Sequence, residues 1–181
     1  MKTINELCSK ITDGEHLNPV FADSGVKMLM ANNIQDELEL TNCKYISESD
    51  HNKFTMKCNP EFGDILMVSR GATIGRACIN NTTEKFSLMG SVILIKPNIS
   101  FITNRYLLAW LRHDQIRDRI ANTSSASAQQ AIYMKDLKKK IIMCPPLPPP
   151  KPIRRHRRQN RGAKKPSSSR RSTRRSCCST A

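Results

Sequence analysis

The sequence lacks the features that would assign it to a membrane, secreted or zinc-binding class. No apolar run approaches the roughly 18 consecutive residues of a membrane-spanning helix, and no apolar signal core follows Met1-Lys2-Thr3. The seven cysteines form neither a C-x-x-C pair nor a repeated Cys/His spacing, so metal or disulfide chemistry is the weaker interpretation. We therefore expect a cytoplasmic protein with free thiols.

The sequence also lacks the motifs of common enzymes. Gly71-Ala72-Thr73-Ile74-Gly75 does not have G-x-G-x-x-G spacing, and the chain contains no G-x-x-x-x-G-K-[ST] phosphate loop. Cys144-Pro145-Pro146-Leu147 has neither the polar first residue nor the aromatic last residue of an adenine methyltransferase motif. The four histidines, including His156, suggest no Ser/His/acid or Cys/His arrangement. We expect a chain that is not an enzyme and has no cofactor or metal of its own.

Acidic residues are missing from the last part of the chain. The 181 residues carry a net charge of +15, which is typical of nucleic-acid-binding proteins. However, residues 1–150 hold 18 Lys+Arg and 15 Asp+Glu, a net charge of +3, whereas residues 151–181 hold 12 Lys+Arg and no acid, a net charge of +12. The chain therefore joins two parts of different composition.

Residues 1–147 are predicted to form a single globular α/β (α+β) domain with a mixed, twisted sheet and few helices. Short apolar runs alternate with polar loops there, without an internal repeat. The proline-rich stretch that follows precludes a regular helix or central strand. Residues 148–181, a linker and a basic tail, have almost no aliphatic side chains to offset the entropy of ordering, and we expect them to be disordered alone.

Apolar runs predict strands at Val26–Met30, Asp64–Ser69, Ile74–Ile79 and Phe86–Lys96, with a further strand-like run at Ile141–Met143. Within these, Ser91–Ile95 is apolar on both faces and rich in β-branched residues, which predicts a central strand covered on both sides. A short turn is expected around Met134–Leu137.

A helix is predicted from Thr103 or Asn104 to about Ala121. Its evidence is a cap-type residue followed by apolar residues at helical spacing, namely Tyr106, Leu107, Trp110 and Leu111. The outer face carries Arg105, Arg112, Arg117 and Arg119. We interpret these arginines as solvated side chains of a surface helix, in preference to phosphate contacts.

Two segments carry polar side chains next to glycine. In Ile11-Thr12-Asp13-Gly14-Glu15-His16, a turn that hydrogen-bonds its own backbone is favoured over a metal site, with contact to a DNA strand as a third interpretation. Residues 60–76 predict a turn, a strand, a glycine-containing loop and a second strand, with Ser69, Arg70, Thr73 and Arg76 around the loop. Physical chemistry alone favours a plain hairpin with exposed arginines.

The order of several motifs is more specific than any one of them. Along the chain these motifs are Ile11-Thr12-Asp13-Gly14-Glu15-His16 with Pro19, Asn33-Ile34, Tyr45-Ile46-Ser47, Gly63-Asp64-Ile65-Leu66 with Gly71-Ala72-Thr73-Ile74-Gly75-Arg76, Tyr106-Leu107, Ser127-Ala128-Gln129-Gln130-Ala131-Ile132 and Pro145-Pro146-Leu147-Pro148. Together they resemble the first half of a specificity (S) subunit of type I restriction enzymes, over about residues 4–148.

The resemblance implies a target-recognition domain that reads half of a bipartite sequence in the major groove of double-stranded DNA, and contributes specificity but no catalysis. Methyltransferase (M) and restriction (R) subunits are the implied partners, and S-adenosylmethionine, Mg²⁺ and ATP belong to them. The candidate DNA contacts are Thr12, Asp13, His16, Ser69, Arg70, Thr73, Arg76, Ser127, Gln129 and Gln130. Arg70 and Arg76 are expected to pair with phosphate or guanine, and Gln129 or Gln130 with adenine.

The sequence departs from the family pattern in two places. Ser124-Ser125-Ala126-Ser127 has no glycine, and an arginine run follows Pro149-Pro150-Lys151-Pro152 where the family continues into an apolar-periodic docking helix. One codon choice for Arg154–Gly162, read one nucleotide later, encodes the opening of such a helix. We therefore hypothesise a recognition domain truncated or frameshifted at its C-terminus, with impaired assembly.

Two alternatives stay open. One is a nonspecific nucleic-acid-binding protein that acts through its basic tail by counterion release. The other is an S-like subunit of a single-chain restriction system, which would need a docking helix that this sequence does not show.

Overall fold

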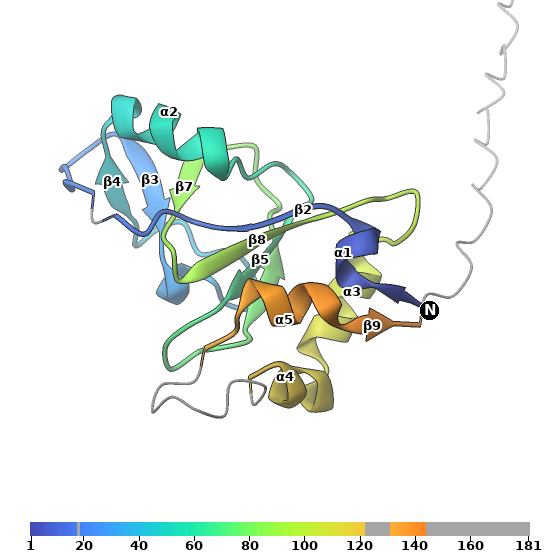
Figure 1. The fold of residues 1–181 in the computed structure, drawn as a ribbon. Coiled ribbons are helices and arrows are strands. Elements are labelled where there is room, and N and C mark those ends of the chain that lie inside the picture. The colour runs from blue at the N-terminus through green and yellow to red at the C-terminus, as the bar shows by residue number, and fades with distance from the viewer. Residues whose placement is uncertain (18, 122–130, 144–181) are drawn as a thin grey trace, which may run out of the picture. The chain divides into compact units, whose positions relative to one another are not determined.

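The computed structural model describes residues 1–17, 19–121 and 131–143. Within these residues the elements, shown in Figure 1, are β1 (Lys2–Thr3), α1 (Ile4–Leu7), β2 (Cys8–Asp13), β3 (Val26–Leu29), a 3-10 turn η1 (Ala31–Asn33), β4 (Lys44–Ile46), α2 (Glu48–Lys57), β5 (Ile65–Val68), β6 (Ala77–Ile79), β7 (Phe86–Leu88), β8 (Val92–Pro97), α3 (Asn104–Arg112), α4 (Asp114–Ala121), α5 (Met134–Lys139) and β9 (Ile141–Ile142). This is the α+β fold that the sequence predicts, with few helices and small twisted sheets.

The largest sheet has the strand order β2-β8-β5-β6, with each neighbouring pair antiparallel. Strand β8 lies between β2 and β5, and Val92–Ile95 are at most 1% exposed. Ile93 and Ile95 contribute to one hydrophobic core, whereas Val92 and Leu94 contribute to another. The alternation follows from the two-residue period of a strand. The prediction of a central strand covered on both faces is confirmed.

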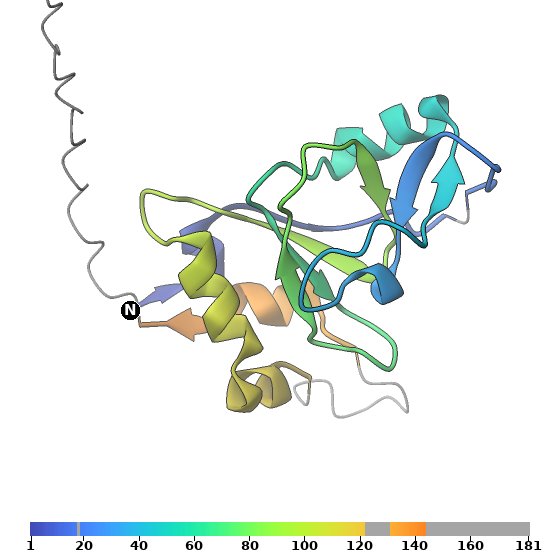
Figure 2. The same cartoon turned by 180° about the vertical axis from the view of Figure 1, so that it is seen from behind.

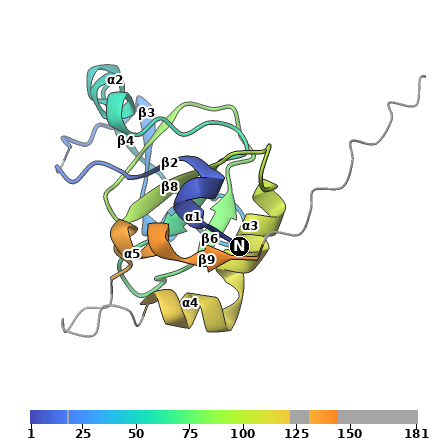
Figure 3. The same cartoon turned by 45° about the vertical axis from the view of Figure 1, so that its right-hand side comes forward.

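The two cores are closed by different elements. Helices α1, α3, α4 and α5 supply apolar side chains to the first core, including Ile4, Leu107 and Leu137, and Figures 1 and 3 show these helices around one end of the domain. The second core includes Leu29 and Leu88 from a sheet of order β4-β3-β7. Figure 2 shows that smaller sheet, with α2 above it, at the opposite end. The central sheet is therefore held between two apolar layers.

A two-stranded sheet brings the beginning of the chain beside residues 141–142. In it, Lys2 pairs with Ile142 and Thr3 pairs with Ile141, so the predicted strand at Ile141–Met143 is confirmed apart from its last residue. Thr3 also begins α1 with a capping box, because its side chain accepts from the Glu6 amide while the Glu6 carboxylate accepts from the Thr3 amide. The turn expected at Met134–Leu137 is the helix α5.

The prediction of one continuous strand over Phe86–Lys96 is wrong, because the structure divides it into β7 and β8, which belong to different sheets. The turn between them is closed by a hydrogen bond from the Val92 amide to the Met89 carbonyl, 2.9 Å long. The Gly90 amide donates to the Glu15 carbonyl at 2.6 Å. The local turn and the pairing of Gly90 with the distant Glu15 segment together separate β7 from β8.

The predicted helix over Thr103–Ala121 is correct at its start and wrong in its continuity. Thr103 is the N-cap, and its hydroxyl accepts from the Tyr106 amide at 3.2 Å. His113 has an extended backbone, with φ −64° and ψ 125°, and separates α3 from α4. Its carbonyl accepts from the amides at the start of the new helix, and the bend lets Leu111 and Ile120 contribute to the same core.

The other strand predictions hold with shifted ends. Strands β3 and β5 match Val26–Met30 and Asp64–Ser69, whereas β6 begins only at Ala77 because residues 71–76 fold into tight turns. The elements β2, β4, α1 and α2 were not predicted, since their residues mix apolar and polar side chains without a clear period.

Four cysteines lie within the described residues, and all four are free thiols: Cys8, Cys43, Cys58 and Cys78. Burial raises the pKa of Cys8 and of Cys78 to about 12, and that of Cys58 to about 11. These three thiols are therefore protonated at neutral pH and behave as small apolar side chains. No helix among the described residues has the length and apolarity needed to cross a bilayer.

Because β8 is buried on both faces, truncation of its side chains should lower the free energy of unfolding strongly. Leu94→Ala should lower the free energy of unfolding by about 2–5 kcal/mol, because the site cannot collapse between two packed layers. Lys10→Ala in the neighbouring strand β2 is the control, because Lys10 is exposed and its truncation should cost less than about 0.5 kcal/mol. Urea unfolding of both variants measures the difference, and equal losses would contradict the described burial of β8.

Candidate nucleic-acid interface

Strands β2 and β5 both end beside the start of β8. Asp13, the last residue of β2, pairs with Ile93 on one side of β8, and Val68, the last residue of β5, pairs with Val92 on the other. The Ser69 amide then donates to the Ser91 carbonyl at 2.8 Å. The two described segments with candidate DNA contacts therefore leave the central sheet at the same end, on either side of one strand.

The first of these segments, the Thr12–His16 turn, is fixed by its backbone. The Gly14 amide donates to the Val92 carbonyl at 3.0 Å, and the Glu15 amide donates to the Leu88 carbonyl at 2.8 Å. A Cβ atom added to Gly14 would lie 2.2 Å from the carbonyl oxygen of Leu88. Glycine is required here because two backbone segments approach each other more closely than a side chain allows.

The carboxylate of Asp13 contacts the basic side chains at this turn. Its Oδ1 lies 2.8 Å from the Lys57 Nζ of α2, and its Oδ2 contacts the His16 Nε2. The Lys57 Nζ also donates to the Gly14 carbonyl at 3.5 Å. Lys57 was not predicted to belong to the site, because it lies on another element, 44 positions from Asp13 in the sequence.

The neighbours of Asp13 determine its ionisation. Partial burial by itself raises the pKa of the Asp13 carboxyl, but the hydrogen bonds from Lys57 and His16 and the electrostatic interactions with these two residues outweigh burial and hold that pKa below its usual range. Asp13 is therefore an anion at neutral pH, with both oxygens engaged. Among the described residues, no group of three or more His, Cys, Asp or Glu side chains lies together as a metal site would require.

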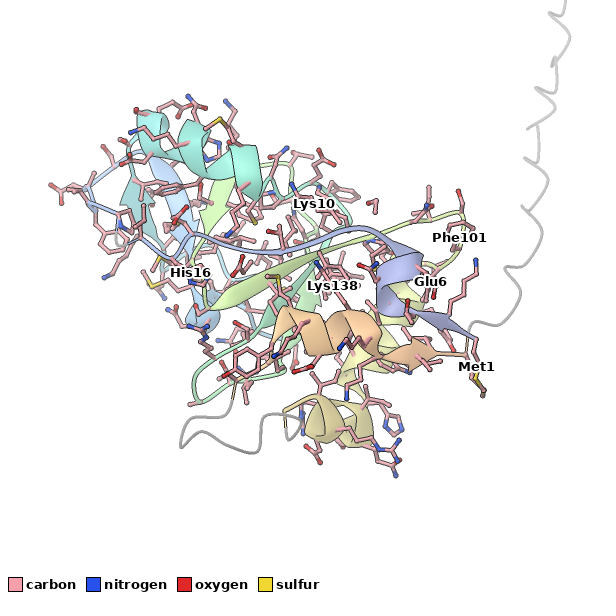
Figure 4. All side chains as sticks on the ribbon, viewed as in Figure 1. Met1, Glu6, Lys10, His16, Phe101 and Lys138 are labelled. Carbon is pink, nitrogen blue, oxygen red and sulfur yellow. The ribbon has the colours of Figure 1, made fainter. Side chains whose placement is uncertain are left out.

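The three candidate side chains of the turn differ in exposure. Thr12 is 8% exposed, and its hydroxyl donates to the neighbouring Asp13 carbonyl at 3.4 Å. The His16 side chain is 46% exposed. Figure 4 shows His16 at the end of β2 opposite Glu6 and Met1. Of the three, His16 is the side chain that an external ligand can reach most easily.

The second segment is the loop of residues 69–76 between β5 and β6, which the sequence predicts as a glycine-containing loop. Gly75 has a φ of +81°, and its amide donates to the Val68 carbonyl at 2.9 Å, while the Val68 amide donates to the Arg76 carbonyl at 2.8 Å. Ser69 is 4% exposed, and its carbonyl accepts from the Ile132 amide at 2.8 Å. Ser69 thus holds the base of the loop.

The outer part of this loop carries the accessible candidates. Arg70 is exposed and forms an antiparallel bridge with Ala131, the residue that directly follows the third candidate segment. The candidates Ser127, Gln129 and Gln130 in that third segment lie outside the described residues. Thr73 is partly exposed, and Arg76 is exposed with its guanidinium donating to the Gln35 side chain.

A cleft of about 550 Å³ adjoins the same loop. Its walls come from Asp36, from Ala72–Ala77 of the loop and the start of β6, and from Arg112 and Arg117 of the helices. The interpretation of Arg112 as a solvated side chain needs correction, because its Nε donates to the Ala77 carbonyl at 2.9 Å and its Nη2 donates to the Asp36 carbonyl at 2.5 Å. Helical spacing alone could not identify these contacts, since the partners come from distant segments.

Polar and basic loops therefore collect at one end of a sheet that is covered on both faces. The family model of the type I restriction modification DNA specificity domain matches residues 1–153. The chain therefore belongs to this family, which is a family of non-catalytic specificity components. The resemblance inferred from the ordered motifs is confirmed.

Solved structures share the fold. One comes from work on complex assembly and conformational transition of a type I R-M system, with a TM-score of 0.59 and 20% identity, covering 81% of this chain and 34% of that one. Another is the HsdS subunit from Thermoanaerobacter tengcongensis, with a TM-score of 0.57 and 19% identity, covering 80% of this chain and 32% of that one. The chain thus spans about a third of each. No curated protein matches it.

The ion pairs of Asp13 predict an acid-sensitive contribution to stability. Folding lowers the pKa of Asp13, so its contribution is present above the pKa of the unfolded carboxyl, about 3.9, and is lost as the pH falls through the folded-state value. Asp13→Asn should therefore lower the free energy of unfolding by about 1 kcal/mol at neutral pH, with a smaller difference at about pH 3.

Urea unfolding at the two pH values checks this prediction. Asp23→Asn is the matched control, because Asp23 is exposed, and it should change stability little at either pH. A loss in Asp13→Asn that is equally large at both pH values would contradict an ionic role for Asp13.

Proposed function

We propose that this domain reads one half of a bipartite sequence in double-stranded DNA, as the specificity component of a type I restriction-modification system. The observation that supports this most directly is the common exit of the Thr12–His16 turn and the Ser69–Arg76 loop at the start of β8. Base recognition needs several side chains on one rigid surface, because phosphate contacts alone carry no sequence information. The central sheet supplies such a support.

The exposures and contacts favour a division of roles among the candidates. Thr12, Asp13 and Ser69 are buried or paired, so their proposed role is to hold the two loops in place. His16, Arg70 and Thr73 are proposed to face the DNA, with Arg70 donating to the O6 and N7 of a guanine.

The third segment is proposed to extend this surface. Ser127, Gln129 and Gln130 precede Ala131, which pairs with Arg70. A glutamine amide can donate to N7 and accept from N6 of adenine, so Gln129 or Gln130 is proposed to read an adenine beside the position read by Arg70.

Assembly is the second part of the proposal. A related structure concerns complex assembly in a type I R-M system, and family membership favours M and R subunits as partners of this chain. S-adenosylmethionine, Mg²⁺ and ATP chemistry would reside on those subunits. The basic segment 151–181, with its net charge of +12, favours an additional sequence-independent attraction to DNA.

Selection from a random duplex library tests whether the full chain reads bases. In the presence of excess nonspecific duplex, the full chain should enrich a short sequence motif. The tail control is a full-length variant in which Arg154, Arg155, Arg157 and Arg158 are glutamine. It should bind more weakly at low salt but enrich the same motif. Enrichment of no motif by either protein would contradict DNA reading and favour nonspecific binding by the tail.

Substitution of Arg70 tests the role of the loop. Arg70→Ala should weaken binding to the selected duplex by about 1–3 kcal/mol and relax the preference at a single base pair. Arg105→Ala, which removes an exposed arginine on α3 away from the loop, is the control and should leave the motif unchanged. Fluorescence anisotropy with single-substituted duplexes measures both effects. An unchanged preference in Arg70→Ala would remove Arg70 from the base-reading surface.

A further inference from the structure

The cleft between the 69–76 loop and the helices concentrates positive charge. Arg76, Arg112 and Arg117 line it together with one acidic residue, Asp36. Residues 1–17, 19–121 and 131–143 contain six arginines, so half of the arginines in the described part of the chain border this one cleft. Residues 1–150 carry a net charge of only +3. The positive charge at the cleft is therefore a local concentration in a part of the chain whose acidic and basic residues are nearly equal in number.

The guanidinium groups of Arg76 and Arg112 are each held in place by hydrogen bonds. Arg112 donates to the Ala77 and Asp36 carbonyls, and Arg76 donates to the Gln35 side-chain oxygen. These partners are uncharged acceptors, and neither Arg76 nor Arg112 forms an ion pair with a side chain in the described ranges. Their positive charge is thus oriented but not neutralised, which favours an anion in the cleft.

Arg117 is positioned by packing against the loop. A Cβ atom added to Gly75 would lie 2.5 Å from the Cγ and 2.9 Å from the Cδ of Arg117, so the aliphatic part of Arg117 rests against the Gly75 backbone. Its Nη2 forms an ion pair of 2.9 Å with Asp114, whose side chain is 81% exposed. An ion pair this exposed contributes little energy, so an incoming anion can compete with Asp114 for the guanidinium.

We infer that this cleft binds a phosphate group of the DNA backbone, held by Arg76, Arg112 and Arg117 with Thr73 at its edge. Guanidinium groups pair with phosphate oxygens through two parallel hydrogen bonds, which suits a polar cleft lined by three of them. The inference rests on the proposed function and deepens it, because the loop that bears Arg70 also forms one wall of the cleft. A phosphate held there would fix the register of the duplex against that loop.

The dependence of DNA affinity on salt tests the inference on the full chain. Arg117→Gln keeps the first two methylene groups that pack on Gly75 and removes the charge. It should weaken binding about tenfold and reduce the slope of log K against log salt by about one, without changing the base preference. Arg117→Lys should keep most of the slope. Circular dichroism of each variant verifies that it is folded.

Arg105→Gln is the matched control for that experiment, since Arg105 is an exposed arginine of α3 outside the cleft. It should leave the salt slope within error of the parent chain. An unchanged slope in Arg117→Gln, or an equal reduction in Arg105→Gln, would overturn the inference. If the parent chain shows a base preference and Arg117→Gln leaves the slope unchanged, the phosphate site in the cleft is rejected and the proposed function stands. If Arg117→Gln reduces the slope but the parent chain shows no base preference, the phosphate site stands and the proposed function is rejected.

Two probes distinguish a backbone phosphate from a free anion. Arginine Nε–H resonances of Arg112 and Arg117 should shift on addition of a duplex, and this shift should be weaker in Arg76→Gln. Inorganic phosphate at millimolar concentration should produce a smaller shift that the duplex displaces. Saturation by inorganic phosphate together with no response to the duplex would show a free-anion site and overturn the assignment to DNA.

Discussion

The burial of β8 on both faces is the constraint on which the rest of this domain depends. Val92 and Leu94 face one apolar layer while Ile93 and Ile95 face another, so the register of β8 against β2 and β5 is fixed on two sides at once. A shift of one residue would exchange every side chain between the two cores. The positions at which β2 and β5 leave the sheet are therefore determined by core packing.

That register connects the core to the surface. The Thr12–His16 turn and the Ser69–Arg76 loop begin where the neighbours of β8 end, and each is held by backbone hydrogen bonds to the β7–β8 corner or to β8 itself. Glycine at position 14 permits the close backbone approach, and Lys57 neutralises the carboxylate of Asp13 beside it. The bases of both loops are thus fixed by the core of the domain.

The sequence predicted those parts of the fold that local patterns determine. The run at residues 91–95 is apolar without interruption, and Thr103 is followed by apolar residues at helical spacing, so both were recognised. The break between β7 and β8 was missed because it depends on pairing of Gly90 with Glu15, and the bend at His113 was missed because it depends on the shared core beneath Leu111 and Ile120. The first depends on pairing with a distant segment, and the second depends on the packing of two consecutive helices into the core.

The same distinction applies to the site. Glycines and arginines at residues 69–76 mark a loop in the sequence itself, whereas Lys57, Arg112 and Arg117 join the surface only through folding. No spacing rule links Arg117 to Gly75, although the two pack directly together. The candidates Ser127, Gln129 and Gln130 lie outside the described residues and remain predictions.

Hydrogen exchange of the full chain with and without its selected duplex tests the central claim most directly. The account predicts protection of backbone amides in residues 12–16 and 69–76, the two loops at the start of β8, with little change in α1, which lies at the opposite end of β2 from His16 (Figure 4). Protection confined to residues 151–181, with both loops unchanged, would contradict it and assign DNA binding to the basic segment.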